Sequence, residues 1–218
     1  MIEMEIEGEA YPLIVDLGYF AQMTLDDEIL QKVNKKPYGI SQFKDFKNNH
    51  YESKNHLVPE IKIGNFSFIE VVVEEQNEAF EKNIVIRKST KKPSKRRGTI
   101  GRALLKRKNI LLDFPHSRLA LIDNDNHQIG YPIENMLKVP FEMTFSGVVL
   151  NIETDLGEKK FLVDTGTTGI VIRSSLCNAE ECQKDFDELN YFTSSQFVIG
   201  GKNFGEMPLY LLDIRPLA

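Results

Sequence analysis

The stretch Phe161-Leu-Val-Asp164-Thr165-Gly166-Thr167-Thr168 is the most informative segment for predicting the fold of the chain. Its three apolar residues are typical of a buried strand. The Asp-Thr-Gly that follows is typical of a tight turn, because glycine lets the backbone bend sharply. A carboxylate in this place is either an ordinary turn-capping group or a reactive group. The remainder of the sequence decides between these two interpretations.

A similar pattern occurs close to the N-terminus. Residues 6–18 contain a polar Gly-Glu turn, an apolar strand and an Asp-Leu-Gly turn, and residues 156–166 contain the same features in the same order. Further on, the Ile-Lys-Ile-Gly-Asn-Phe of residues 61–66 resembles the Phe-Val-Ile-Gly-Gly-Lys-Asn-Phe of residues 197–204. Two similarities in the same order predict a chain built from two related lobes.

Most of the sequence predicts β-structure. Alternating polar and apolar residues indicate half-buried strands, and short apolar runs indicate buried ones. We therefore expect an all-β fold with few short helices. The alternating segments are residues 3–8, 60–64 and 148–153, and the apolar runs are residues 13–15, 71–73, 110–112 and 161–163.

Three short helices are expected between the strands. Residues 25–33 follow Thr24, a suitable N-cap, and have three acidic residues, 26–28, in the first turn, where the helix dipole favours them. Residues 101–108 are the second candidate. Residues 180–189 are the third, although their apolar spacing is poor.

The segment Gly98-Thr-Ile100-Gly101-Arg-Ala-Leu-Leu105, which precedes the apolar run 110–112, makes the pattern specific. It resembles the closing element of retroviral proteases, an apolar-apolar-Gly strand followed by I-G-R-x-L-L and a final strand. With the Asp-Thr-Gly turn, it resembles pepsin-like and retropepsin-like aspartic peptidases. The resemblance implies an acid-protease fold with two related lobes of the six-stranded type. In that fold a strand containing Ile100 and Gly101 would thread the loop that carries the first acid.

The resemblance implies that Asp16 and Asp164 form a catalytic dyad. Two carboxyl groups at a shared water cannot both ionise, so they share one proton. One then acts as general base on the water, and the other donates to the carbonyl oxygen of the peptide. Glycines allow the loops to approach closely, and hydroxyl groups hold the carboxyl groups by hydrogen bonds across the loops. The expected supporting residues are Gly18, Thr165, Gly166 and Thr167.

Cys177 and Cys182 have the C-x4-C spacing of a small disulfide loop that pepsin-like enzymes often carry. The resemblance implies a disulfide and an oxidising compartment; two free thiols are the alternative. The acidic, alternating N-terminus is not a signal peptide. The localisation stays open: exported or periplasmic if the disulfide forms and a leader is missing, and cytoplasmic otherwise.

The resemblance also implies a substrate-covering hairpin, or flap, between Gly39 and Leu57, with a turn at Asn48-Asn49. The lobe boundaries follow from the repeat. We expect a first acid-protease lobe at residues 1–122, a polar linker at residues 123–138 and a second lobe at residues 139–218.

Two departures from the family pattern bear on activity. The first loop has Leu17 and Tyr19 where the family has hydroxyl residues, so the usual hydrogen bonds across the loops are lost from this side. The second lobe has 54 residues after Asp164 and no second apolar-apolar-Gly element. We therefore expect the second lobe to be incomplete, with a loop that lacks its threading strand unless a partner chain supplies one.

The sequence predicts an aspartic-type endopeptidase homologue that hydrolyses peptide bonds with an Asp dyad activating water. The alternative is a catalytically inactive homologue that acts as a peptide-binding or dimerisation module. An all-β binding domain unrelated to peptidases would require three ordered matches to be accidental. The expected partner is an extended peptide or protein substrate, which pairs like an added strand. A homodimer stays open.

Composition excludes several other functions. A net charge of -5 argues against a general nucleic-acid binder. We interpret the basic run at residues 91–97 as a solvated loop, and a nuclear address or a polyanion contact is the alternative. No stretch approaches the ~20 apolar residues of a membrane helix. The two cysteines have no paired histidines, and the four histidines are scattered. We therefore expect no metal site and no cofactor.

Overall fold

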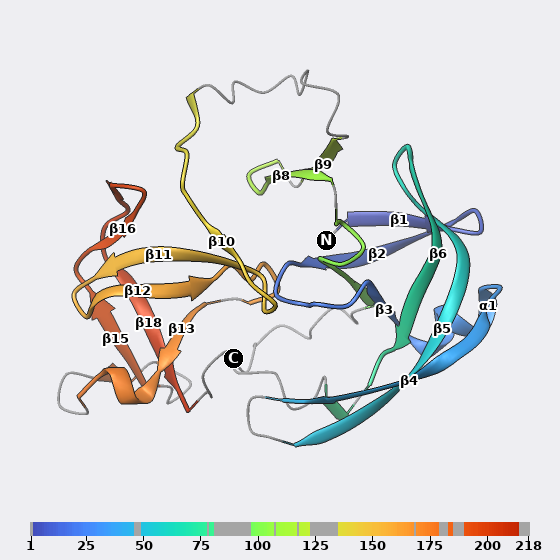
Figure 1. Cartoon of the computed structure of the whole chain (residues 1–218), viewed down its shortest axis with the longest axis horizontal. Coiled ribbons are helices and arrows are strands. Elements are labelled where there is room, and N and C mark those ends of the chain that lie inside the picture. The colour runs from blue at the N-terminus through green and yellow to red at the C-terminus, as the bar shows by residue number, and fades with distance from the viewer. Residues whose placement is uncertain are drawn as a thin grey trace. The chain divides into compact units, whose positions relative to one another are not determined.

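The computed structural model divides into two compact units (Figure 1), residues 1–43 with 50–131, and residues 44–49 with 132–218. Each unit has its own sheets and its own apolar core. The structure describes residues 2–45, 49–77, 79–80, 97–106, 108–116, 118–122, 135–167, 169–178, 183–184 and 190–213.

The fold is all-β, as expected from the sequence. Helix α1 (Asp27–Lys32) and the short 3-10 helix η2 (Ser174–Leu176) have both of their ends within the described residues, and residues 79–80 are also helical. The first nine strands are β1 (Ile2–Ile6), β2 (Glu9–Asp16), β3 (Met23–Leu25), β4 (Lys36–Lys44), β5 (His50–Ile63), β6 (Phe66–Glu75), β7 (Gly98–Gly101), β8 (Asn109–Asp113) and β9 (Arg118–Ile122). The others are β10 (Glu142–Met143), β11 (Val148–Thr154), β12 (Gly157–Leu162), β13 (Ile170–Arg173), β14 (Gln183–Lys184), β15 (Asn190–Ser194), β16 (Phe197–Ile199), β17 (Lys202–Asn203) and β18 (Met207–Leu212).

The first unit is a six-stranded barrel. Its sheet has the order β1-β2-β7-β3-β6-β5-β4, and a further pairing of β1 with β5 closes the ring. Strand β4 lies outside the ring as the outer strand of a hairpin with β5, and β8 and β9 form a separate two-stranded sheet. Closure removes the open edges that β1 and β5 would otherwise present. The interior is filled by buried apolar side chains from β1, β2, β3, α1, β5, β6 and β7 and the turn after β7.

Strand β7 is inserted between β2 and β3. It runs parallel to β2, with Val15 opposite Ile100 and Asp16 opposite Gly101, and antiparallel to β3. Ile100 is completely buried. A Cβ on Gly101 would lie 2.2 Å from the backbone oxygen of Ala21, so only glycine fits this place without a backbone shift. The segment with Ile100 and Gly101 therefore stands directly beside the strand that ends in Asp16.

Two of the expected helices differ from the structure. Thr24 lies in β3 and pairs with Glu74, so it does not cap α1. The N-cap is Asp26, whose carboxylate accepts a hydrogen bond from the amide of Ile29 at 3.0 Å. The predicted helix at residues 101–108 was wrong: residues 102–106 form turns. The stretch between β7 and β8 is too short to offset the cost of nucleating a helix.

Of the third expected helix, residues 183–184 form strand β14, and residues 180–182 and 185–189 lie outside the described residues. Several other predictions also fall there. They concern the linker residues 123–134, the basic residues 91–96, Asn48 of the flap turn, and Cys182. Across the part of the chain that the structure describes, no helix is long and apolar enough to cross a membrane.

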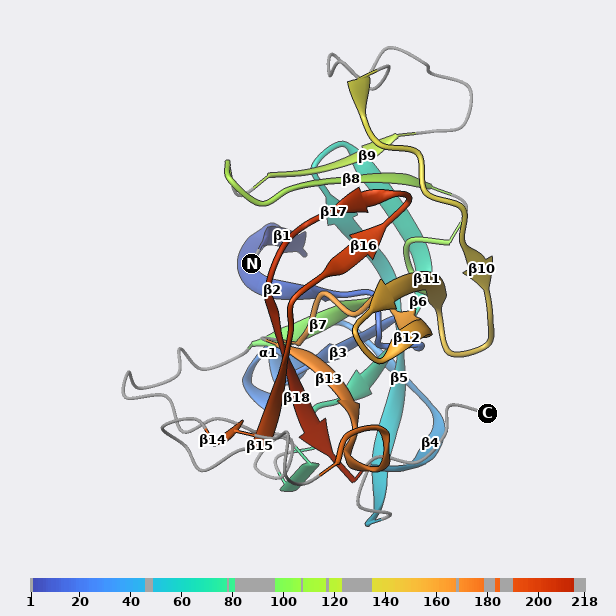
Figure 2. The ribbon, with the colours of Figure 1, turned by 90° about the vertical axis from the view of Figure 1, so that its left-hand side faces the viewer.

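The second unit contains two sheets. One holds β11 at its centre, paired with β10, β12 and β16, and β16 continues into β17. The other has the order β13-β18-β15-β14, and Figure 2 shows β13, β18 and β15 side by side. The core of the second unit is built around Ile152, Ile172, Phe197, Leu209 and Leu211.

Strand pairing in the second unit repeats that of the first. Hairpin β11–β12 corresponds to β1–β2, and the pairing of β11 with β16 corresponds to that of β1 with β5. The parallel pair β13 and β18 corresponds to the parallel pair β3 and β6. Strand β7 has no counterpart among the described residues of the second unit, where β12 pairs with β11 alone.

The turns repeat as well. Gly8 and Gly157, in the two Gly-Glu turns, both have a φ of 84°. Gly64 and Gly200, in the second pair of similar segments, both have a φ of 57°. These left-handed conformations are accessible to glycine at little cost, which explains why glycine stands at both members of each pair. The local geometry thus agrees with a duplicated unit.

Candidate active site

Asp16 is the last residue of β2 and begins a tight turn. One of its carboxylate oxygens, Oδ1, accepts hydrogen bonds from the backbone amides of Gly18 at 2.9 Å and Tyr19 at 3.1 Å. The amide of Tyr19 also lies 3.2 Å from the backbone oxygen of Asp16. These bonds fix one carboxylate oxygen of Asp16 against its own loop, and the carboxyl group is partly exposed.

The turn after β7 holds the loop from the other side. The amide of Gly101 donates to the backbone oxygen of Gln22 at 2.9 Å, and the amide of Arg102 donates to that of Tyr19 at 3.0 Å. The amide of Ala103 donates to the backbone oxygen of Ala21 at 3.3 Å. Three successive backbone amides thus bind the loop that follows Asp16, and they fix its path independently of any side chain.

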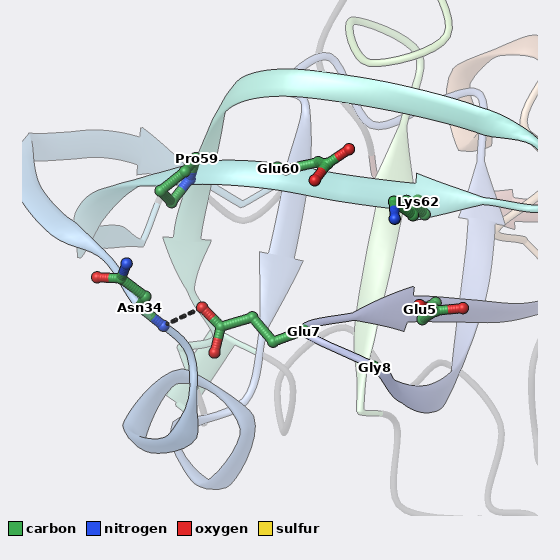
Figure 3. A pocket seen from close by; sticks show the side chains of 7 residues that line it. All are labelled: Glu5, Glu7, Gly8, Asn34, Pro59, Glu60 and Lys62. Atoms are coloured by element: carbon green, nitrogen blue, oxygen red, sulfur yellow. Dashed lines mark hydrogen bonds between the residues drawn. The ribbon is translucent and has the colours of Figure 1, made fainter.

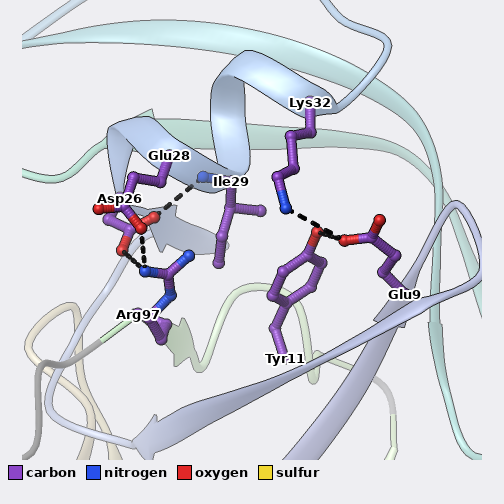
Figure 4. A network of polar contacts seen from close by, with 7 residues as sticks. All are labelled: Glu9, Tyr11, Asp26, Glu28, Ile29, Lys32 and Arg97. Atoms are coloured by element: carbon purple, nitrogen blue, oxygen red, sulfur yellow. Dashed lines mark hydrogen bonds and ion pairs between the residues drawn. The ribbon is translucent and has the colours of Figure 1, made fainter.

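An ion-pair network anchors the start of β7 (Figure 4). The guanidinium of Arg97 lies 3.1 Å from Asp26 and 2.5 Å from Glu28, and the amide of Asp26 donates to the backbone oxygen of Arg97 at 2.9 Å. The hydrogen bond with Glu28 raises the pKa of Arg97, which is charged throughout in any case. Helix α1 and strand β7 are therefore tied together at the residue before Gly98.

A second contact in Figure 4 joins the start of β2 to α1. The hydroxyl of Tyr11 donates to Glu9 at 2.5 Å, and Lys32 lies 3.5 Å from the same carboxylate. The hydrogen bond to Glu9 raises the pKa of Tyr11 to about 12, and the same bond lowers the pKa of Glu9. This contact lies at the opposite end of β2 from Asp16 and stabilises the strand rather than the acid.

Leu17 occupies the place where the family pattern has a hydroxyl residue. It is partly buried and packs against the core of the first unit. An apolar side chain there cannot donate a hydrogen bond to the opposite loop. At this position the loop of Asp16 is therefore stabilised by apolar packing, whereas the family pattern has a hydrogen bond there.

Tyr19 occupies the other expected hydroxyl position, and its phenol is hydrogen-bonded. Its hydroxyl donates to Glu74 at 2.6 Å, and Glu74 is buried at the end of β6. Glu74 could not be identified from the sequence. It directly follows the apolar run of β6, and a charged residue in such a place is more simply expected to be exposed to solvent.

Asp164 follows β12 in a loop of similar geometry. Its Oδ1 accepts a hydrogen bond from the amide of Gly166 at 2.7 Å, the counterpart of the bond from Gly18 to Asp16. The amide of Val163 donates to the backbone oxygen of Val148 at 2.8 Å and continues the β11–β12 ladder up to the acid. Both acids thus stand at the end of the second strand of a hairpin, and each accepts a bond from the glycine two residues later.

The hydroxyl of Thr167 is used within its own loop. It donates to the backbone oxygen of Gly169 at 3.0 Å, and the side chain is exposed. Thr167 therefore shapes the turn that leads into β13. Gly166 supplies the amide that binds Asp164, and Thr165, which lies between these two residues, has a partly buried side chain.

The predicted site residues fall into two groups. Asp16, Gly18, Ile100 and Gly101 lie together in the first unit, and Asp164, Thr165, Gly166 and Thr167 lie together in the second. Cys177 follows η2 and packs partly against the core of the second unit. Its predicted partner Cys182 lies outside the described residues, so the disulfide stays a prediction.

A surface hollow lies beside the turn between β1 and β2 (Figure 3), and Asp16 is at the other end of β2. Side chains of Glu5, Glu7, Glu60 and Lys62 line it, beside Asn34 and the turn glycine Gly8. Glu7 accepts a hydrogen bond from the amide of Asn34 at 2.8 Å, which ties the β1–β2 turn to the chain after α1. All the lining side chains are exposed, and three are carboxylates. The hollow is therefore an open, acidic surface and no part of the Asp16 loop.

No group of three or more His, Cys, Asp or Glu side chains within the described residues could hold a metal ion. No protein-family model matches the sequence, and comparison with the curated proteins finds none that is significantly similar.

Proposed function

We propose that the chain is an aspartic-type endopeptidase homologue in which Asp16 and Asp164 act as one dyad. The observation that carries the proposal is the matched geometry of the two loops. Asp16 is the last residue of β2 and Asp164 comes two residues after the end of β12, and each accepts a hydrogen bond from the amide of the glycine two residues later. The ordinary alternative, a turn-capping aspartate, does not require a second copy of the same loop.

The strand insertion beside Asp16 supports the same proposal. Strand β7 lies between β2 and β3, with Gly101 opposite Asp16, and the next residues bind the backbone of the acid loop. These contacts restrain the loop of Asp16. Restrained geometry is what general acid–base catalysis at a shared water requires.

In the proposed reaction, the two carboxyl groups share one proton around a water molecule. The ionised carboxylate takes a proton from the water, which attacks the peptide carbonyl, and the protonated carboxyl donates to the carbonyl oxygen to give a tetrahedral diol. The carboxyl that took the proton of the water then passes it to the leaving nitrogen as the C–N bond breaks, and a diol hydroxyl returns a proton to the other carboxylate as the new carboxylic acid forms. The substrate is an extended peptide or protein segment, and the β4–β5 hairpin is the element that would cover it.

A second candidate function is peptide binding without cleavage, as a peptide-binding or dimerisation module. Leu17 favours it, because an apolar residue packed against the core replaces a hydroxyl that would otherwise orient the dyad. An inactive homologue would keep the loops and the covering hairpin and would bind extended peptides without hydrolysing them.

Cleavage of a peptide library by the purified chain, with and without pepstatin, tests the proposal. Cleavage should be inhibited by pepstatin and lost in Asp164→Asn. The matched control is Asp213→Asn, the same change at an exposed position in the same unit, which should cleave like the wild type. Unchanged cleavage by Asp164→Asn would exclude the assigned mechanism. Binding of library peptides without cleavage would select the second candidate.

A further inference from the structure

Glu74 is a buried carboxylate with partners on two different elements. It lies at the end of β6 and is 7% exposed. Its Oε2 accepts the hydroxyl proton of Tyr19 at 2.6 Å, and its Oε1 accepts that of Ser41 at 3.0 Å. Both of its oxygen atoms are therefore bound by hydroxyl groups, and each hydroxyl comes from a different part of the first unit.

The first partner belongs to the acid loop. The amide of Tyr19 donates to Oδ1 of Asp16 at 3.1 Å, and its backbone oxygen accepts a bond from Arg102. A shift of the Tyr19 ring therefore moves a residue that directly binds the carboxylate of Asp16.

The second partner belongs to the β4–β5 hairpin, residues 36–63. Ser41 lies on the outer strand β4, and the side-chain amide of Asn55 on β5 donates to its hydroxyl oxygen at 2.8 Å. Asn55 stands opposite Glu74 in the ladder between β5 and β6. Ser41 thus connects both strands of the hairpin to the buried carboxylate.

The face of the β4–β5 hairpin that carries Ser41 is packed, whereas the opposite face is exposed to solvent. Phe43, two residues after Ser41, stacks on Tyr51 with ring centroids 5.6 Å apart, and Phe80 packs edge-on to both rings. Gln42 lies on the opposite face and donates to Glu52 at 2.6 Å in an exposed pair. The contact of Ser41 with Glu74 is therefore made from the inner face of the hairpin.

We propose that Glu74 is a positioning residue that couples the β4–β5 hairpin to the Asp16 loop through Ser41 and Tyr19. The inference depends on the proposed function, in which the hairpin covers an extended peptide and Asp16 is one of the two acids. An ionised carboxylate accepts both hydroxyl protons at once, and such charge-assisted bonds are strong and directional. Closure of the hairpin over a peptide then also fixes the loop that holds the acid.

Amide hydrogen exchange of the peptide-free protein tests the coupling without any need for activity. Tyr19→Phe keeps the ring and removes the hydroxyl. It should raise exchange in residues 36–44 and 50–57, to which Glu74 and Ser41 link the Tyr19 hydroxyl, by about tenfold, the factor that one lost hydrogen bond of this kind represents. Ser41→Ala should raise exchange in residues 17–22 in the same way. Exchange in β1 should stay unchanged.

Two matched variants complete the design. Gln42→Ala removes a hydrogen bond from the outer face of the hairpin, and Glu75→Gln neutralises the carboxylate next to Glu74, which lies 3.7 Å from Lys54. Neither should affect residues 17–22. If Tyr19→Phe loosens only its own loop and Ser41→Ala only the hairpin, the coupling is refuted. A general rise that includes β1 would also refute it, because that would be a loss of barrel stability.

Kinetics separate this proposal from the proposed function. With a peptide cleaved by the wild type, Tyr19→Phe should lower kcat about tenfold with little change in KM, because the acid loses its orientation while the cleft remains. If the wild type cleaves nothing, the proposed function fails and hydrogen exchange still decides the coupling. If cleavage occurs and exchange shows no coupling, only the role of Glu74 is overturned.

Discussion

The two aspartate loops share their local geometry and differ in what supports them. The loop of Asp16 is held by its own turn, by three backbone amides from the segment after β7, and by the bond from Tyr19 to buried Glu74. The loop of Asp164 is held by the bond from Gly166 and by the ladder of β11 with β12. The turn itself is therefore encoded by neighbouring residues, whereas its rigidity comes from contacts with distant parts of the chain.

The cores of the two units differ in the same direction. Among the described residues, the first unit buries 17 apolar side chains in one cluster and the second unit buries 5. Since burial of apolar surface is the main stabilising term, the first unit should be the more stable of the two. Each of the following changes tests one part of this difference, in order of the expected effect.

The largest effect is expected from Gly101→Ala. A Cβ there would lie 2.2 Å from the backbone oxygen of Ala21, which cannot move without breaking the contacts of the acid loop. We expect a loss of about 3 kcal/mol or more in the free energy of unfolding of the first unit, measured by urea denaturation.

The matched change in the second unit is Gly169→Ala. Its Cβ would lie 3.1 Å from the ring of Tyr210, a side chain that can adjust. It should cost no more than about 1 kcal/mol. If both variants lose the same free energy of unfolding, β7 does not restrain the Asp16 loop more tightly than side-chain packing restrains the chain at Gly169.

A smaller effect is expected at the helix cap that anchors β7. Asp26→Ala removes the bond to the amide of Ile29 and the ion pair with Arg97. We expect a loss of about 1–2 kcal/mol from the first unit in the same denaturation experiment. Asp26→Asn keeps a capping oxygen and should lose less. If both variants lose the same amount, the ion pair rather than the cap accounts for the stability.

The smallest expected effect is a difference between the two units in how much acidification destabilises them. All four histidines belong to the first unit, and burial lowers the pKa of His56 below its usual 6.5. Because the folded state disfavours the charged imidazole, this contribution is present above pH 6.5 and is lost as the pH falls through the lowered pKa. Acidification should therefore destabilise the first unit by less than about 1 kcal/mol through His56.

His56→Gln should flatten this pH dependence between neutral and acidic pH, measured as the urea midpoint of the first unit. The second unit contains no histidine and should show no comparable change in this range. An unchanged slope in His56→Gln would assign the pH dependence to other groups.

Much of the fold could be predicted from the sequence. The alternation of β1 and the apolar runs of β2 and β6 depend on short-range patterns, which a single sequence displays directly. The glycines at positions 8 and 157 mark turns that require a positive φ. The strand that places Gly101 beside Asp16 could be expected because a sequence pattern of several residues in order marks it.

The remainder depended on contacts between distant residues. Thr24 was expected to cap α1, but its pairing with Glu74 in the sheet draws it into β3 and leaves the cap to Asp26. The role of Glu74 could not be predicted, because Tyr19 and Ser41 are 55 and 33 residues away from it. A pattern confined to neighbouring positions does not contain such pairings.

The measurement that tests the central claim most directly is kcat/KM for the wild type, Asp16→Asn, Asp164→Asn and the double variant on one cleaved peptide. If the acids act as one dyad, each single change should lower kcat/KM on the order of 10²–10⁴-fold, and the double variant should be no worse than either. Losses that multiply in the double variant, or a single variant that cleaves like the wild type, would contradict the claim.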